Sequence, residues 1–89
     1  LIKELSTVIK SNPDKRFAIV GHTDSTGSYA ANMKLSKSRA NRVRIKLISK
    51  YGIRKNQIIA SGVGYLSPIT SNIDGIGRQL NRRVELVQL

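Results

Sequence analysis

Two short apolar runs with a long helical segment between them limit this chain to few folds. The run "RFAIVGHT", residues 16–23, is rich in β-branched and aromatic residues and has no helical period, so it predicts a buried strand. Residues 29–51 then repeat apolar side chains every three or four positions, and Gly52 follows where a helix C-cap would lie. The run "QIIASGVG", residues 57–64, predicts a second strand. This order indicates a βαβ unit, whose two strands are parallel and joined by a right-handed crossover.

Two further elements complete the predicted fold. Residues 1–12 place apolar side chains on one helical face, and Pro13 ends that helix because it disfavours helical geometry at the preceding residue. The stretch "RRVELVQL", residues 82–89, alternates well enough to predict a final strand. No crossover helix of comparable length precedes it, so we expect it to be antiparallel to a neighbour. The predicted fold class is α+β, a mixed sheet with helices packed on one face, in a single domain that covers residues 1–89.

The charge of the chain limits its partners. Sixteen Lys and Arg against five Asp and Glu give a net charge of +11 at pH 7, which favours polyanions such as nucleic acid or anionic lipid. From Ser25 to Ile73 every charged residue is basic, so Asp24 is the last acid before a long cationic stretch. Cations on the outer face of the long helix are typical of a solvated face. The absence of cysteine excludes disulfides and thiolate chemistry, but it fits cytosol and periplasm equally well.

A single histidine limits enzymatic chemistry. Any Ser, His and Asp arrangement, or any His-ligated metal site, would have to use His22. Neither Ser36 nor Ser38 lies in a nucleophile-elbow sequence, and the glycines form neither a phosphate loop nor a dinucleotide fingerprint. We therefore expect no enzyme activity, no metal and no cofactor, and we interpret His22 as a hydrogen-bonded residue that shapes a turn.

The turn "GHTDSTG", residues 21–27, is the first candidate binding site. It follows the first strand and precedes the long helix. The carboxyl end of that strand and the start of the helix form one edge of the sheet, and ligands favour this edge because helix N-terminal amides point into it. Asp24 has two interpretations there. An Asp among small residues is common in turns and N-caps, and its carboxylate is also able to bind a cationic ligand.

Several motifs occur in the order and spacing of a known family. They are a Gly-His-Thr-Asp turn, an Asn eight residues after that Asp, a Leu-Ser-x-x-Arg-Ala helix, and an Asn-Arg-Arg-Val strand entry. With the segments "IIASGVGYLSP" and "GRQLNRRVEL", they resemble the OmpA-like C-terminal domain, the peptidoglycan-associated module of outer-membrane proteins, Pal lipoproteins and flagellar stator proteins. The resemblance runs from about Phe17 to Leu86.

The resemblance implies a function and a site. The function is non-covalent binding of peptidoglycan through the diaminopimelate of its stem peptide, which anchors the outer membrane or a membrane complex to the cell wall. The family's ligand contacts map onto Asp24 and Arg39 as the central pair, with Thr23, Asn32 and Arg82 as supporting hydrogen-bonding residues. Diaminopimelate carries an ammonium and a carboxylate on one carbon away from the peptide backbone, so an anion and a cation a few ångströms apart would suit it. An arginine fork matches a carboxylate in two hydrogen bonds.

The sequence alone does not readily show which of three adjacent residues, Asn81, Arg82 or Arg83, lines the pocket. Asn81 and Arg83 flank Arg82, and adjacent strand residues face opposite sides, so only one of the two arginines can readily line the pocket. The resemblance favours Arg82. Tyr65 departs from the family, since relatives often have an acidic residue after the second glycine of "GVG".

The resemblance also implies a cellular context. It indicates a location in the periplasm of a Gram-negative bacterium, as part of an outer-membrane or envelope-anchored protein. Attachment to the membrane is then expected only through other parts of the parent protein. A homo-oligomer is possible. The family order is βαβαββ, so we expect its first strand to lie upstream of this chain or to be missing. The alternative is a basic nucleic-acid-binding module. Against it, the four aromatic residues are scattered rather than paired on a strand, so we expect no specific nucleic acid.

Overall fold

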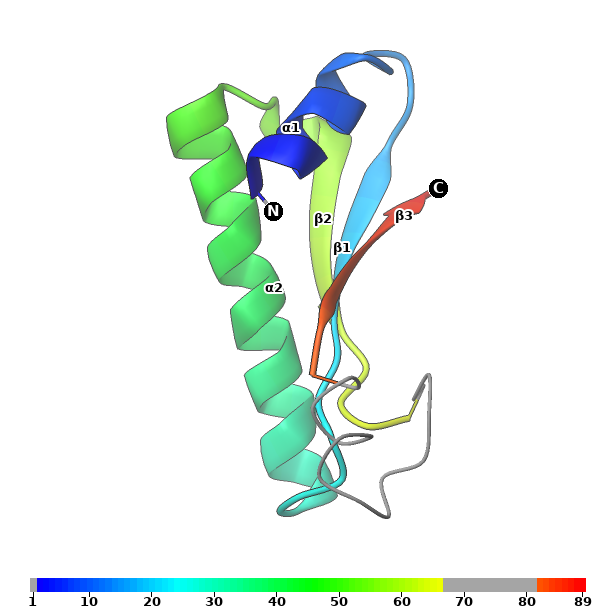
Figure 1. Cartoon of the computed structure of the whole chain (residues 1–89), viewed down its shortest axis with the longest axis vertical. Coiled ribbons are helices and arrows are strands. Elements are labelled where there is room, and N and C mark those ends of the chain that lie inside the picture. The colour runs from blue at the N-terminus through cyan, green and yellow to red at the C-terminus, as the bar shows by residue number, and fades with distance from the viewer. Residues whose placement is uncertain (1, 67–81) are drawn as a thin grey trace.

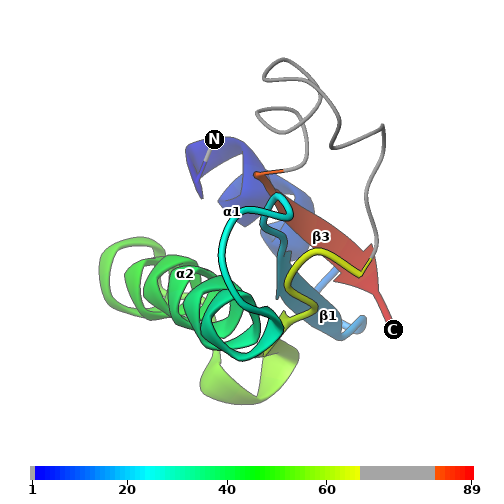
Figure 2. The ribbon, with the colours of Figure 1, turned by 90° about the horizontal axis from the view of Figure 1, so that it is seen from below.

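The computed structural model describes residues 2–66 and 82–89 as two helices, a short 3-10 turn and three strands. Their bounds are α1 Ile2–Lys10, β1 Phe17–Gly21, α2 Tyr29–Tyr51, η1 Lys55–Gln57, β2 Ile58–Gly62 and β3 Val84–Gln88. The sheet order is β2-β1-β3, with β1 parallel to β2 and antiparallel to β3. Both helices lie on the same side of this sheet (Figure 1, Figure 2). The predicted mixed α+β sheet is therefore confirmed.

The long helix has the bounds that its sequence period predicts. Ser28 is the N-cap, and its Oγ accepts a hydrogen bond of 3.1 Å from the amide of Ala31. Gly52 ends the helix with φ at 69°, the left-handed region that glycine adopts without strain, and its amide donates to the carbonyl of Leu47. The buried residues of α2 are spaced four or seven positions apart, at Asn32, Ser36, Ala40 and Leu47.

The strands are shorter than their apolar runs. β1 ends at Gly21, although the amide of His22 still bonds to the carbonyl of Arg83 in the β1–β3 register, at 2.8 Å. The amide of Thr23 bonds instead to the carbonyl of Gly64, also at 2.8 Å. Gln57 forms part of the 3-10 turn instead of starting β2. The last strand begins two residues later than predicted, at Val84. No strand precedes α1 among residues 2–66 and 82–89.

One apolar core lies between the helices and the sheet. Its buried members come from every layer: Ile9, Phe17, Ile19, Ala40, Leu47, Ile53 and Ile58. The side chain of Gln57 fixes α1 to this core, because its Nε2 donates to the carbonyls of Ile9 at 3.2 Å and Asn12 at 3.0 Å. The opposite face of the sheet is more open, with Ile59 and Val87 each more than 40% exposed. No described helix is long and apolar enough to span a bilayer.

A glycine allows the end of β1 to approach the middle of α2. A Cβ at Gly21 would overlap the backbone carbonyl oxygen of Ser36, so no larger residue fits without a shift of strand or helix. Four element ends meet at one end of the molecule: the end of β1, the start of α2, the end of β2 and the start of β3 (Figure 1). Most of the predicted site residues lie at this end.

Candidate functional site

The carboxylate of Asp24 is the centre of the candidate site. Its side chain lies in the turn after β1 and is only 6% exposed. Oδ1 accepts a hydrogen bond of 2.9 Å from the amide of Thr26, and Oδ2 accepts one of 2.6 Å from Nη1 of Arg82. Asp24 therefore shapes the turn, as one interpretation of the sequence predicted, and it also places a charge beside an arginine.

Asp24 is held in its ionised form. Burial is the largest influence on its pKa and raises it, because burial disfavours the charged form. The hydrogen bonds from Thr26 and the charge of Arg82 together outweigh burial, so the pKa of Asp24 lies below its ordinary value. A buried carboxylate that stays ionised is suited to binding a cation.

An arginine-lined hollow lies next to this carboxylate. It has a volume of about 420 Å³ and is lined by Arg39 of α2 and by Arg82, Arg83 and Val84 at the start of β3. Arg82 joins the two features, because this residue lines the hollow and its guanidinium bonds to Asp24. Among the described residues, the ion-pair partner of Asp24 is thus Arg82 and not Arg39. Arg39 is half-buried, and no hydrogen bond or ion pair holds its guanidinium within the described part of the chain.

Arg83 has a different partner from its neighbour. Its Nε donates to Oε1 of Glu85 at 2.5 Å, and Oε2 of Glu85 lies 3.6 Å from Nε2 of the buried His22. The hydrogen bond from Arg83 is the main cause that lowers the pKa of Glu85. Both arginines line the hollow, contrary to the expectation that only one of them could do so. Arg82 is the one that contacts Asp24, whereas Arg83 pairs with Glu85. Asn81 lies outside the described residues.

The remaining predicted residues, Asn32 and Thr23, are also buried. Nδ2 of Asn32 donates to the carbonyls of Thr26 at 2.7 Å and Ser28 at 3.0 Å, so this side chain fixes the loop between β1 and α2. The hydroxyl of Thr23 is buried and has no hydrogen-bond partner among residues 2–66 and 82–89. Asn32 thus holds the turn in shape, and Thr23 retains hydrogen-bonding capacity next to Asp24.

Sequence reasoning did not identify two contacts that support the site. The Oγ of Ser36, buried on α2, accepts a hydrogen bond of 2.9 Å from the amide of Gly64 and ties the loop after β2 to the helix. Tyr65, next in that loop, packs edge-to-face on Tyr29 with ring centroids 5.8 Å apart. No sequence signal identifies these contacts. The contact of Glu85 with Arg83 follows strand alternation, since residues two apart share a face.

The described residues contain no group of three or more His, Cys, Asp or Glu side chains that would hold a metal ion. The chemistry available at this end is ionic and hydrogen-bonding: one buried carboxylate, several guanidinium groups and a buried hydroxyl.

The fold and the site together define a small α+β binding module, in which a strand-turn-helix carries an anion next to cations at the start of the last strand. The chain belongs to the OmpA family, whose model matches residues 1–82.

Comparison with individual proteins agrees with this assignment. The chain is 43% identical over 84 residues to outer membrane porin F of Pseudomonas aeruginosa, covering 94% of this chain and 24% of that protein. It is 39% identical over 87 residues to the peptidoglycan-binding protein ArfA of Mycobacterium tuberculosis, covering 98% of this chain and 26% of ArfA. The crystal structure of the peptidoglycan-associated lipoprotein from Burkholderia pseudomallei matches with a TM-score of 0.88 at 31% identity, over 99% of this chain and 74% of that one. The chain spans about a quarter of the length of these two curated relatives.

Proposed function

We propose that this chain is a single domain that binds peptidoglycan non-covalently, through the diaminopimelate of the stem peptide. Membership in the OmpA family supports the proposal, as do two relatives named for their binding to, or association with, peptidoglycan. The observation that carries it is the ionised carboxylate of Asp24, buried beside a hollow lined by arginines. A ligand that carries an ammonium and a carboxylate on one carbon matches these two features.

Each charge has a distinct role in this proposal. Asp24 binds the ammonium of diaminopimelate, while Arg39 donates two parallel hydrogen bonds to the carboxylate. Arg82, whose side chain is 45% exposed, turns from Asp24 toward the ligand carboxylate once the ammonium takes its place. Thr23 supplies a further hydrogen bond, and Asn32 keeps the turn in the required shape. Rigid elements on both sides hold these groups in place.

The expected affinity for a single stem peptide is modest. A small polar ligand must offset the cost of association with a handful of hydrogen bonds, so a Kd between about 1 µM and 1 mM is expected. Intact sacculi present many adjacent sites, which increases retention if the parent protein forms oligomers. The role is to anchor an outer membrane or a membrane complex to the cell wall, without catalysis.

The cellular setting follows from the proposed ligand together with the relatives. Porin F of Pseudomonas aeruginosa and the lipoprotein of Burkholderia pseudomallei support a place in the periplasm of a Gram-negative bacterium, as part of an outer-membrane or envelope-anchored protein. A membrane-spanning segment or lipid anchor would then belong to other parts of that protein.

The nucleic-acid alternative makes a different prediction about salt. Binding to a polyanion weakens steeply as salt rises, because condensed counterions are released. Binding of a zwitterion in a partly buried pocket loses much less, because the buried charges are less screened. Comparing the two salt dependences separates the functions.

Sedimentation with purified diaminopimelate-type sacculi tests the proposal. Asp24→Ala and Arg39→Ala each remove a charge-assisted contact worth about 1.5 to 3 kcal/mol, which corresponds to a ten- to hundredfold loss in affinity. Lys34→Gln is the control, because it lowers the charge of the exposed face of α2 without touching the hollow. Circular dichroism confirms that each variant is folded. If both site variants pellet with sacculi as well as wild type does, the proposed site is wrong.

A further inference from the structure

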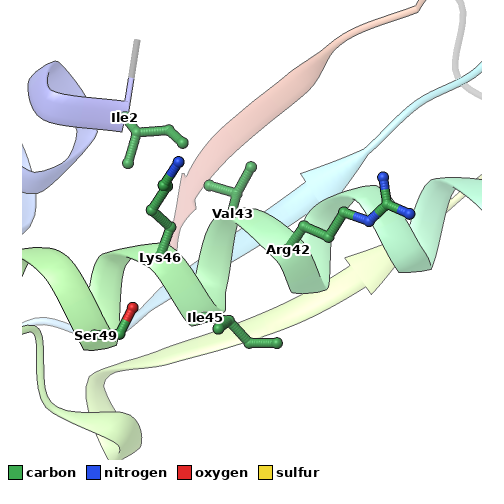
Figure 3. A pocket seen from close by; sticks show the side chains of 6 residues that line it. All are labelled: Ile2, Arg42, Val43, Ile45, Lys46 and Ser49. Atoms are coloured by element: carbon green, nitrogen blue, oxygen red, sulfur yellow. The ribbon is translucent and has the colours of Figure 1, made fainter.

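A second hollow lies between the two helices. Its volume is about 380 Å³, and it is open to solvent along α2 (Figure 3). It is lined by Ile2 of α1 and, on α2, by Arg42, Val43, Ile45, Lys46 and Ser49. We call this hollow the α1–α2 groove.

The α1–α2 groove combines aliphatic walls with cations. Ile2, Val43 and Ile45 supply hydrocarbon surface, and Ile45 is 53% exposed. Arg42 and Lys46 are also exposed, and the side chain of Lys46 extends from α2 toward Ile2 of α1 (Figure 3). Among residues 2–66 and 82–89, no Asp or Glu lines the groove.

The charge on α2 is not balanced within the described part of the chain. The helix has no Asp or Glu, and its cations are Lys34, Lys37, Arg39, Arg42, Arg44, Lys46 and Lys50. None of the ion pairs among residues 2–66 and 82–89 involves this helix. Arg42 and Lys46 are four residues apart, a spacing at which like charges repel along a helix. An anionic partner would relieve this repulsion.

We propose that the α1–α2 groove docks on the surface of an anionic phospholipid membrane. Such a surface presents phosphate groups above hydrocarbon, so it meets the cations and the exposed aliphatic side chain of the groove at the same time. The phosphates contact Arg42 and Lys46, and Ile45 inserts between the headgroups. A nucleic acid would satisfy the cations, but its phosphate backbone offers no hydrocarbon surface for Ile45.

The groove and the Asp24 site lie on different parts of the molecule. Arg42 follows Arg39 by three residues, about 5 Å along the helix axis, and Lys46 follows it by seven, about 10 Å, so the groove begins one turn beyond Arg39. The end that carries Asp24 is remote from α1 (Figure 1). The two surfaces can therefore be occupied together, and membrane docking does not depend on peptidoglycan binding.

Flotation with phospholipid vesicles tests the proposal in the absence of peptidoglycan. Wild-type protein is mixed with phosphatidylcholine vesicles that contain or lack phosphatidylglycerol, and binding is expected only to the anionic vesicles. The double variant Arg42→Gln, Lys46→Gln should partition about thirtyfold more weakly, because each cation near an anionic surface contributes roughly a fivefold gain. Ile45→Ser, which leaves the charge unchanged, should lose about threefold or more from its inserted side chain.

The charge-matched control is Lys34→Gln, Lys37→Gln. It removes two cations from the same helix outside the groove, and we expect it to lose less than about threefold. All four lysine and arginine positions in these variants are exposed, so folding should be preserved, and circular dichroism checks this. Equal losses in the two double variants, or wild-type binding by Ile45→Ser, would overturn the proposal. Binding to duplex DNA that the Arg42 and Lys46 variant loses, without binding to vesicles, would also overturn it and assign the surface to nucleic acid.

Discussion

Replacement of Arg39 by lysine separates pocket recognition from general basicity. Arg39→Lys keeps the positive charge but cannot donate two parallel hydrogen bonds to one carboxylate. The guanidinium of Arg39 has no hydrogen-bond or ion-pair partner within residues 2–66 and 82–89, so the substitution should leave the free energy of unfolding nearly unchanged. Any loss of binding then reports the ligand contact alone.

The expected loss follows from the geometry of the hollow. Arg39 lines it together with Arg82 and Arg83, so two arginines remain to attract the ligand carboxylate when lysine replaces Arg39. The variant should consequently lose only the paired geometry, about 1 to 2 kcal/mol, or roughly five- to thirtyfold in Kd. Arg39→Ala, which also loses the charge, should lose more.

Isotherms for a diaminopimelate-containing stem peptide, measured by calorimetry at two salt concentrations, provide the assay. Lys37→Gln is the control, since it removes an exposed cation of α2 outside the hollow and should change Kd less than about twofold. The reasoning is refuted if Arg39→Lys binds as wild type does while Lys37→Gln binds more weakly. That pattern would mean that net charge, and not a shaped pocket, determines binding.

Two further predictions concern the fold around the site. Gly21→Ala should destabilise the domain by about 2 to 4 kcal/mol in urea unfolding, because the new Cβ meets the carbonyl of Ser36, and an unchanged midpoint would contradict the close approach of β1 to α2. The pKa of Asp24 is lower in the folded protein than in the unfolded chain. Ionised Asp24 therefore stabilises the fold at pH values above the ordinary carboxyl pKa of about 4, and this stabilisation is lost as the pH falls toward the pKa of the folded state. The difference in unfolding free energy between wild type and Asp24→Asn should therefore be largest near neutral pH and shrink below about pH 4, and a difference that stays constant down to pH 3 would contradict the ionised state of Asp24.

The helix between the strands was predictable because its signals are local. A period of three to four residues and a following glycine gave residues 29–51, the bounds that α2 has. The strand ends were less predictable, since an apolar run does not reveal where ladder hydrogen bonds stop. His22 and Thr23 both belong to the run, yet the amide of His22 still bonds to Arg83 in the β1–β3 register, whereas that of Thr23 bonds to Gly64 in the loop after β2.

The partner of Asp24 could not be derived from local patterns. Arg82 is 58 residues away in sequence and reaches Asp24 because β3 pairs antiparallel to β1, with Gly21 opposite Val84. Strand register of this kind depends on long-range pairing, which periodicity does not specify. The family resemblance named Asp24, Arg39 and Arg82 as site residues. The contact of Arg82 with Asp24 became visible only in the structure.

A comparison of two stem peptides tests the central claim most directly. A tripeptide ending in diaminopimelate and the same peptide ending in lysine both carry the side-chain ammonium, but only the first carries the adjacent carboxylate. NMR titration of labelled protein should show at least about tenfold tighter binding of the diaminopimelate peptide, with shifts at the Asp24 turn and at Arg39. Equal affinity for the two peptides, or shifts confined to other surfaces, would contradict recognition of diaminopimelate at this site.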